Sequence, residues 1–302
     1  MSFSVGGWLT AMIIDRRTGL IQLLREGTPA LLVLLAWDVV VVIIFQVAHR
    51  PWMDQPSLPT SLIGSALVLF LSVRNNTAYA RWWEARTLWG AITNNARSFC
   101  REMATLIGGA PDLTRAMVAY AHALRGALQD VDVTAEVERL LTPDIAARIR
   151  GRRNKPNAIL YEVGLCLRAV AQERAVHPAA LAAVDRILSD IANAQGGLER
   201  IRNTPLAIQF SALPGVLVRT FCLLLPLTMV QELGWITPLG SSVVGLLFLA
   251  LNRIGLDLED PFTAGVHALP MRAMTRTIEI DLLQSIGEAA PEPIQAIHGV
   301  LP

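Results

Sequence analysis

Four long apolar stretches constrain this chain more than any other feature of its sequence. They cover residues 29–47, 58–73, 212–230 and 236–252. A helix needs about 20 apolar residues to cross the roughly 30 Å hydrocarbon core of a bilayer. The second stretch is short, but it continues without a helix breaker into a polar segment. With a mean hydropathy of +0.44 and only 17% charged residues, the chain is predicted to be an integral membrane protein with four transmembrane helices.

Arginines near the ends of these stretches predict which side each end faces. The loop at 48–57 carries only Arg50, and the loop at 231–235 carries no basic residue. Because basic residues concentrate on the cytoplasmic side, both termini and the regions 74–204 and 254–302 are expected to be cytoplasmic. The opposite ends hold nine arginines: Arg16, Arg17, Arg25, Arg74, Arg81, Arg86, Arg200, Arg202 and Arg253. Residues 1–26 lack a signal-peptide pattern.

The cytoplasmic region is predicted to be helical, which makes the whole chain an all-α protein. Apolar residues recur every three to four positions, and no alternating strand pattern is visible. Gly, Pro and polar clusters separate the expected helices, and residues 151–157 form a polar loop. The expected helices are 75–107, 113–129, two short pieces within 133–150, 158–174 and 179–195.

Charge is distributed unevenly along the chain. Residues 74–204 hold 18 basic and 13 acidic residues, whereas residues 254–302 hold seven acids against Arg272 and Arg276. These regions are complementary and could pack together. The acidic segment 257–285 could wrap a neighbouring subunit, or it could be a solvated face. The overall charge of +1 predicts no nucleic-acid partner.

The sequence offers no enzymatic or metal-binding motif. The glycine-rich nucleotide loops, the zinc-protease HExxH and the hydrolase GxSxG are all missing from it. Its five histidines are scattered, and its three cysteines show no paired spacing. We therefore expect no catalytic residue, no metal and no cofactor.

Two ionisable residues fall inside the apolar stretches, Asp38 in the first and Arg219 in the third. Charges in lipid are costly, so both should face protein or water. They could form an ion pathway, as in a transporter. The alternative, which we favour, is an internal pair or a set of polar contacts that fixes helix packing.

The second apolar stretch shows two stripes at helical spacing. One is Ser65, Leu69 and Val73, and the other is Leu62, Ala66 and Phe70. Spacing alone favours plain helix packing. If several copies surrounded an axis, however, such a stripe would form rings that gate by dewetting. The residues that follow, Arg74, Asn75 and Asn76, could form a polar collar below those rings, or they could belong to an interfacial belt with Trp82 and Trp83.

Three motifs carry a resemblance to a known family. RNNTAYARWWEARTLWG follows the second apolar stretch, LERIRNTPLA precedes the third, and GLDLEDPF follows the fourth. In this order they resemble the signatures of the bestrophin family, bacterial branch. The resemblance implies one bestrophin-like domain over residues 1–302, assembled as a homopentamer around one axial pore. It places Ser65, Leu69 and Val73 in a hydrophobic neck, and a second, cytoplasmic constriction near Ala183 or Val184.

The resemblance also bears on ions and location. Animal bestrophins are calcium-activated chloride channels with an acidic run after their DPF motif, but here TAGVHALPMR follows Asp260-Pro261-Phe262. Calcium favours several carboxylate ligands, so no calcium activation is expected. The bacterial branch implies monovalent cation conduction in the inner membrane. A chloride channel of the same fold, or a transporter using Asp38 and Arg219, is the alternative. The expected partners are other copies of the chain, monovalent ions and the lipid bilayer.

Overall fold

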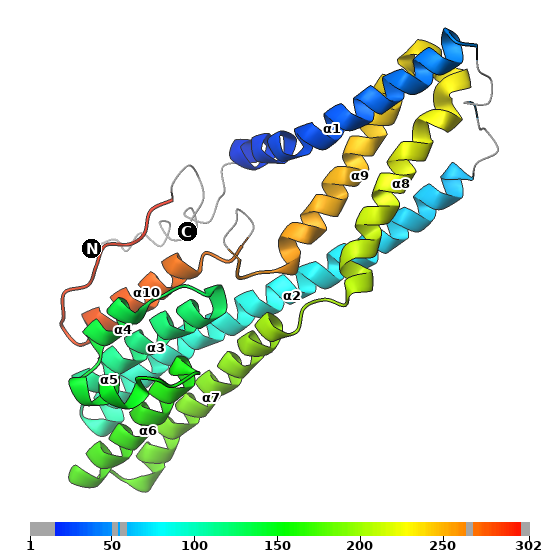
Figure 1. Ribbon diagram of the computed structural model, residues 1–302. Coiled ribbons are helices and arrows are strands. Elements are labelled where there is room, and N and C mark those ends of the chain that lie inside the picture. Colours follow the sequence, from blue (N-terminus) through cyan, green and yellow to red (C-terminus); the bar gives the residue numbers. More distant parts are fainter. Residues whose placement is uncertain (1–15, 50–53, 55–58, 264–267, 297–302) are drawn as a thin grey trace, which may run out of the picture. The chain divides into compact units, whose positions relative to one another are not determined.

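The computed structural model describes residues 16–49, 54, 59–263 and 268–296, with side chains described from Pro29 onward. Within these ranges the chain is helical and contains no strand, as the sequence predicted (Figure 1). Arg50, residues 1–15 and the start of the second apolar stretch lie outside the described residues. The helices are α1 (Arg16–Gln46), α2 (Thr60–Glu102), α3 (Pro111–Gln129), α4 (Thr134–Leu140), α5 (Pro143–Ile149), α6 (Lys155–Glu173), α7 (Pro178–Asn203), α8 (Ile208–Leu233), α9 (Thr237–Glu259) and α10 (Met271–Ser285).

The chain forms two compact units that interleave along the sequence. One contains Ile13–Trp82 and Pro205–Pro261, and we call it the apolar unit. The other contains Trp83–Thr204 and the described part of the tail from Phe262, and we call it the polar unit. The expected four spans all fall within the apolar unit.

The apolar unit consists of α1, α8, α9 and the first part of α2. α9 packs against both α1 and α8, and α1 also contacts α8 (Figure 1). Leu67 and Leu71 of α2 pack with Val218, Phe221 and Leu225 of α8 in a buried cluster. Two described segments, Pro29–Gln46 and Ile208–Glu259, are long and apolar enough to cross a membrane, and the second contains both α8 and α9.

A tight turn separates α8 from α9, at the position that the sequence indicated. Gly234 adopts a positive φ of 52° and begins a short 3₁₀ turn, Gly234–Ile236. Pro238 then lies in the first turn of α9, where its missing N–H costs no helical hydrogen bond. The two helices can therefore pack against each other directly.

Helix α2 is one uninterrupted helix of 43 residues, about 65 Å long. It confirms that the second apolar stretch continues into the polar segment. The helix ends in a π-helical turn, Met103–Ile107, and Gly108 closes that turn in the left-handed region with φ 92°. Glycine suits this position because it has no Cβ to clash there.

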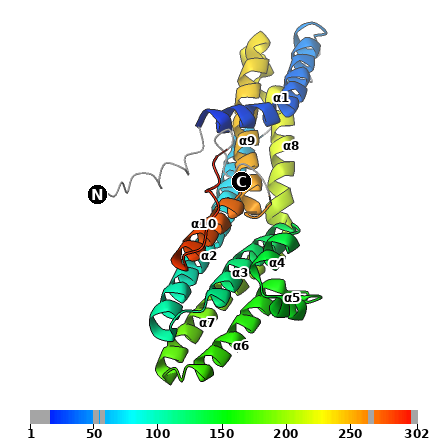
Figure 2. The ribbon, with the colours of Figure 1, turned by 90° about the vertical axis from the view of Figure 1, so that its left-hand side faces the viewer.

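The polar unit is a helical bundle with α3 at its centre (Figure 2). Most residues of α3 are buried, and the helix contacts α4, α6, α7 and α10. The short helices α4 and α5 are the two pieces that the sequence predicted. α7 continues to Asn203, past the predicted end at residue 195.

Helix α10 was not predicted, and it changes the interpretation of the acidic tail. It packs against α3 of its own chain. Glu279 accepts a hydrogen bond from Arg139 at 2.7 Å, Asp281 pairs with Arg97 at 2.5 Å, and Glu288 beyond the helix pairs with Arg115. The predicted complementarity of tail and middle region is therefore met within one chain.

Candidate functional site

The face of α2 that carries Ser65, Leu69 and Val73 is exposed along its whole length. The exposed fraction is 68% for Leu69 and 55% for Val73, and Ser65 is also exposed. Leu67 and Leu71 on the opposite face are 1% and 2% exposed. The described part of the chain thus buries one side of this helix and leaves the predicted stripe uncovered.

The second stripe lies beside the first and is exposed as well, at Leu62, Ala66 and Phe70. The polar groups of this surface are satisfied within the helix itself. Ser65 donates its hydroxyl hydrogen bond to the carbonyl of Ser61 at 2.8 Å, and Thr77 donates to the carbonyl of Val73 at 2.9 Å. The surface is therefore apolar, with hydroxyls that need no further partner, and it carries no charge.

The three residues expected to form a polar collar have different environments. Arg74 is fully buried, and its Nη1 donates to both the backbone carbonyl and Oδ1 of Asn252 at 2.9 Å. Asn75 is half-buried and donates to the carbonyl of Leu251 at 3.0 Å. Arg74 and Asn75 thus join α2 to α9, and of the three only Asn76 is exposed. Sequence spacing could not reveal this, because Asn252 is distant in the chain.

Gly255 of α9 makes this close approach possible. A Cβ at Gly255 would lie 2.0 Å from Oδ1 of Asn75 and 3.1 Å from Nη1 of Arg74. Glu259, one turn further along α9, lies 3.9 Å from Nη2 of Arg74 and accepts a hydrogen bond from Ser211 at 3.1 Å. The arginine is therefore surrounded by groups of its own chain.

Asp38 and Arg219 do not form a pair in the described chain. Asp38 is 1% exposed, and its Oδ2 accepts hydrogen bonds from the hydroxyls of Ser241 and Ser242. Arg219 lies at an exposed position of α8. Polar contacts between α1 and α9, one of the readings that the sequence left open, thus hold Asp38. The two adjacent serines of α9 were the missed signal.

The candidates for a second constriction differ in exposure. Val184 is fully buried within the polar unit, whereas Ala183 is partly exposed. A side chain that its own subunit buries offers no surface to a lumen. Of the two, Ala183 is the residue that could line one.

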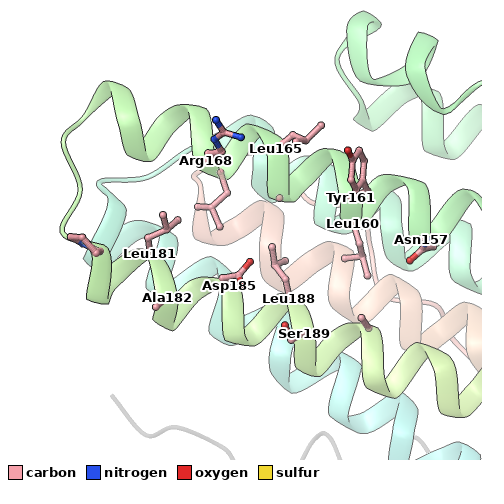
Figure 3. Close-up of a pocket in the computed structure, with 14 residues that line it drawn as sticks. Asn157, Leu160, Tyr161, Leu165, Arg168, Leu181, Ala182, Asp185, Leu188 and Ser189 are labelled. Carbon is pink, nitrogen blue, oxygen red and sulfur yellow. The ribbon is translucent and has the colours of Figure 1, made fainter.

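A groove of about 680 Å³ runs between α6 and α7 in the polar unit (Figure 3). Figure 3 shows Leu160 of α6 and Leu188 of α7 in the space between the two helices, and Tyr161 and Arg168 also come from α6. Its lining is mainly apolar, and within the described residues no group of His, Cys, Asp or Glu is arranged to hold a metal.

Comparisons with known proteins place the chain in a family. The family model described as "Bacterial/Fungal Bestrophin protein" matches residues 14–284. A voltage-dependent anion channel-forming protein of Mesorhizobium japonicum is 34% identical over 244 residues, covering 79% of this chain and 78% of the relative. One from Ralstonia nicotianae is 34% identical over 250 residues, covering 80% and 82%.

Solved structures agree with this assignment. A bacterial bestrophin homologue from Klebsiella pneumoniae matches with a TM-score of 0.81 and 29% identity, covering 86% of this chain and 98% of its own. A structure described only as a membrane protein matches with a TM-score of 0.83 and 28% identity, covering 87% and 99%. The fold and the matched length define a helical membrane protein. The chain belongs to the bacterial and fungal bestrophin family, and its relatives are named as channels, not as enzymes.

Proposed function

We propose that this chain forms a pentameric ion channel whose pore neck is lined by Ser65, Leu69 and Val73. The observation that carries the proposal is the uncovered apolar face of α2. Leu69 is 68% exposed, although Leu67 and Leu71 on the same helix are almost fully buried. The relatives named as anion channel-forming proteins support conduction as the activity.

Physical chemistry explains how such a face would work. Five copies of the stripe around an axis would form a ring of serine hydroxyls and rings of leucine and valine. An apolar ring binds ions weakly, so a hydrated neck passes them quickly and a dewetted neck stops them. The serine ring would be the widest and wettest of the three.

The proposed topology has four spans, at about residues 29–47, 58–73, 212–230 and 236–252. Its support is the apolar length of α1, α8 and α9 together with the distribution of arginines. Both termini and the polar unit would then lie in the cytoplasm of a bacterium, with the apolar unit in its inner membrane. Ala183 is proposed for the second constriction because it is the partly exposed candidate.

Two ion selectivities follow from different observations. The bacterial branch that the motifs resemble implies monovalent cations, and this is our proposal. The names of the relatives, which describe anion channel-forming proteins, favour anions as the second candidate. The neck side chains are uncharged, so neither ion is favoured by a charged ring. The reversal potential in a planar bilayer under a KCl gradient separates the two by its sign.

Calcium-independent opening is part of the proposal. It is supported by the missing acidic run after Phe262 and by the scarcity of carboxylates near Asp257, Glu259 and Asp260. Open probability measured with calcium and then with a chelator should be the same. A rise of current with calcium would contradict it.

The neck itself is tested by Leu69→Ala and Val73→Ala in planar bilayers. Both changes remove exposed bulk from the proposed rings, so single-channel conductance should rise. Leu71→Ala is the matched control, because it removes a leucine that its own chain buries. Equal conductance in all three variants would place the neck elsewhere. If the purified, unmodified protein is not a pentamer, the proposal is wrong.

A further inference from the structure

The segment from the last turn of α5 to the start of α6 holds the densest run of basic residues in the chain. Five of the eight residues at 148–155 are basic: Arg148, Arg150, Arg152, Arg153 and Lys155. The proposed pore does not use them. Three of these arginines line a pocket of about 460 Å³, together with the first turns of α6. The pocket lies entirely within the polar unit.

The acidic residues of the chain neutralise only part of this run. Nε of Arg148 donates to Glu162 at 2.6 Å, and Arg150 lies 3.7 Å from Glu138. Arg152 and Arg153 are exposed, and the described chain provides neither with a side-chain hydrogen bond or an ion pair. The pocket lining therefore contains three guanidinium groups and a single carboxylate, that of Glu162.

The wall behind these arginines is held in place by the protein. Nδ2 of Asn154 donates to Glu199 at 2.9 Å, and Oδ1 of Asn154 accepts from the backbone N–H of Asn157 at 3.1 Å. Buried Gln195 donates to the same Oδ1 at 3.4 Å and to Glu199 at 2.7 Å. A wall that is ordered before binding lowers the entropic cost of holding a ligand.

We propose that this pocket binds a phosphate group. Unpaired arginines present planar forks of N–H donors that match phosphate oxygens, and such charge-assisted bonds are strong. The first turn of α6 contains no acidic residue, so the positive end of its dipole adds to the field of the arginines. The side chain of Tyr161 lines the same pocket and offers an apolar wall to the remainder of a phosphate ester.

The phosphate can come from an anionic lipid headgroup or from a soluble phosphate compound. Either source supplies the same chemistry to Arg152 and Arg153, so the experiment needs one arm for each.

The first arm titrates inorganic phosphate into the detergent-purified full chain and measures binding by calorimetry. The double variant Arg152→Gln and Arg153→Gln should bind phosphate about tenfold more weakly or worse. The charge-matched control is Arg150→Gln with Arg168→Gln, which also removes two arginines but leaves the pocket lining intact. That control should stay within about twofold of the unmodified chain.

The second arm reconstitutes the same proteins in phosphatidylcholine bilayers with and without phosphatidylglycerol and compares their thermal midpoints. Stabilisation by phosphatidylglycerol that only the pocket variant loses would identify a lipid headgroup. Phosphate binding that only the pocket variant loses, with no stabilisation by phosphatidylglycerol, would identify a soluble phosphate. If the pocket and control variants behave alike in both arms, the proposal is overturned. Because Arg152 and Arg153 are exposed, the variants should fold, and circular dichroism checks this.

Discussion

The apolar unit and the polar unit differ in where their large apolar side chains lie. All but five of the large apolar side chains that are exposed in the described chain belong to the apolar unit. The polar unit buries its apolar side chains around α3 and keeps most of its charges at the surface. A soluble protein rarely exposes so large an apolar surface. The difference is the one expected of an apolar unit that lies in lipid and, in the proposed channel, against neighbouring chains.

The few polar contacts inside the apolar unit are therefore important for how its helices associate. Where lipid is as apolar as a helix surface, packing and interhelical hydrogen bonds determine how helices associate. Asp38 with its two serines joins α1 to α9, Arg74 with Asn252 joins α2 to α9, and the indole N–H of Trp37 donates to the carbonyl of Leu223 at 3.0 Å. The polar unit has ion pairs as well, but it also has an apolar core around α3.

The largest expected effect comes from Arg74→Met in the apolar unit. The change removes both hydrogen bonds to Asn252 and leaves Glu259 without its cation. Breaking a buried pair from one side costs about 3–5 kcal/mol, so the thermal midpoint in detergent should fall steeply. Asn76→Ala is the exposed control two residues further on, and it should change the midpoint little. Equal midpoints for the two variants would show that the contact between α2 and α9 contributes nothing.

Truncating one buried leucine in each unit tests the comparison directly. Leu124→Ala in α3 should cost about 2–5 kcal/mol, because it loses both the transfer free energy and the packing of a fully buried side chain. Leu71→Ala in α2 should cost less in a bilayer, because lipid solvates leucine as well as protein does. Denaturation in lipid nanodiscs compares the two. A larger loss for Leu71→Ala would contradict the assignment of the apolar unit to lipid.

A pH-dependent effect is expected in the polar unit, at Glu279. Burial of this carboxyl would raise its pKa, but hydrogen bonds from His122 and Arg139, with the nearby charge of Arg276, lower the pKa to about 2. A depressed pKa in the folded state stabilises the protein above the ordinary value of 4.5, and this stabilisation is lost as pH falls toward 2. The shift corresponds to about 3 kcal/mol.

The variant Glu279→Gln should therefore flatten the acid limb of stability against pH, measured as the urea midpoint between pH 5 and 2. Asp281→Asn on the same helix is the matched control, since Asp281 pairs with Arg97 in a more exposed position. It should leave most of the acid limb unchanged. Identical pH profiles for the two variants would refute the role of the buried carboxyl.

The smallest expected effect compares two glycines. A Cβ at Gly255 of α9 would overlap Asn75, so Gly255→Ala should destabilise the apolar unit by about 1–3 kcal/mol. Gly164 in α6 has no atom within 4 Å of the same position, so Gly164→Ala should stabilise by about 0.5–1 kcal/mol through helix propensity. Relative to the unmodified chain, the thermal midpoint should fall for Gly255→Ala and rise for Gly164→Ala. A neutral Gly255→Ala would mean that α2 and α9 can separate at no cost.

The sequence predicted most helices, because apolar length and periodicity are local properties. The long helix through residues 60–102 follows from an apolar stripe that no breaker interrupts, and the pair α4 and α5 follows from Pro143. α10 was missed although its buried residues Met271, Ile278 and Leu282 recur at helical spacing, so the local signal was present in the sequence. The family was recognised from three short motifs, and the comparisons confirm it.

Within the candidate site the sequence predicted that the stripe shares one helix face, but neither its exposure nor the contacts beside it. The spacing of Ser65, Leu69 and Val73 fixes them on one helix face, whatever lies around the helix. The burial of Arg74 depends on Asn252, which is 178 residues away. Asp38 likewise depends on serines more than 200 positions further along the chain. Long-range polar partners of this kind need the folded structure.

The central claim is that the uncovered face of α2 lines a water-filled path, and cysteine accessibility tests it most directly. Leu69→Cys and Val68→Cys place a thiol at adjacent exposed positions that point about 100° apart on the helix. A charged, membrane-impermeant thiol reagent is added during recording in a planar bilayer, with the unmodified chain as the control for its own cysteines. We expect the reagent to block current through Leu69→Cys and to leave Val68→Cys unaffected. Block at Val68→Cys with none at Leu69→Cys would contradict the account.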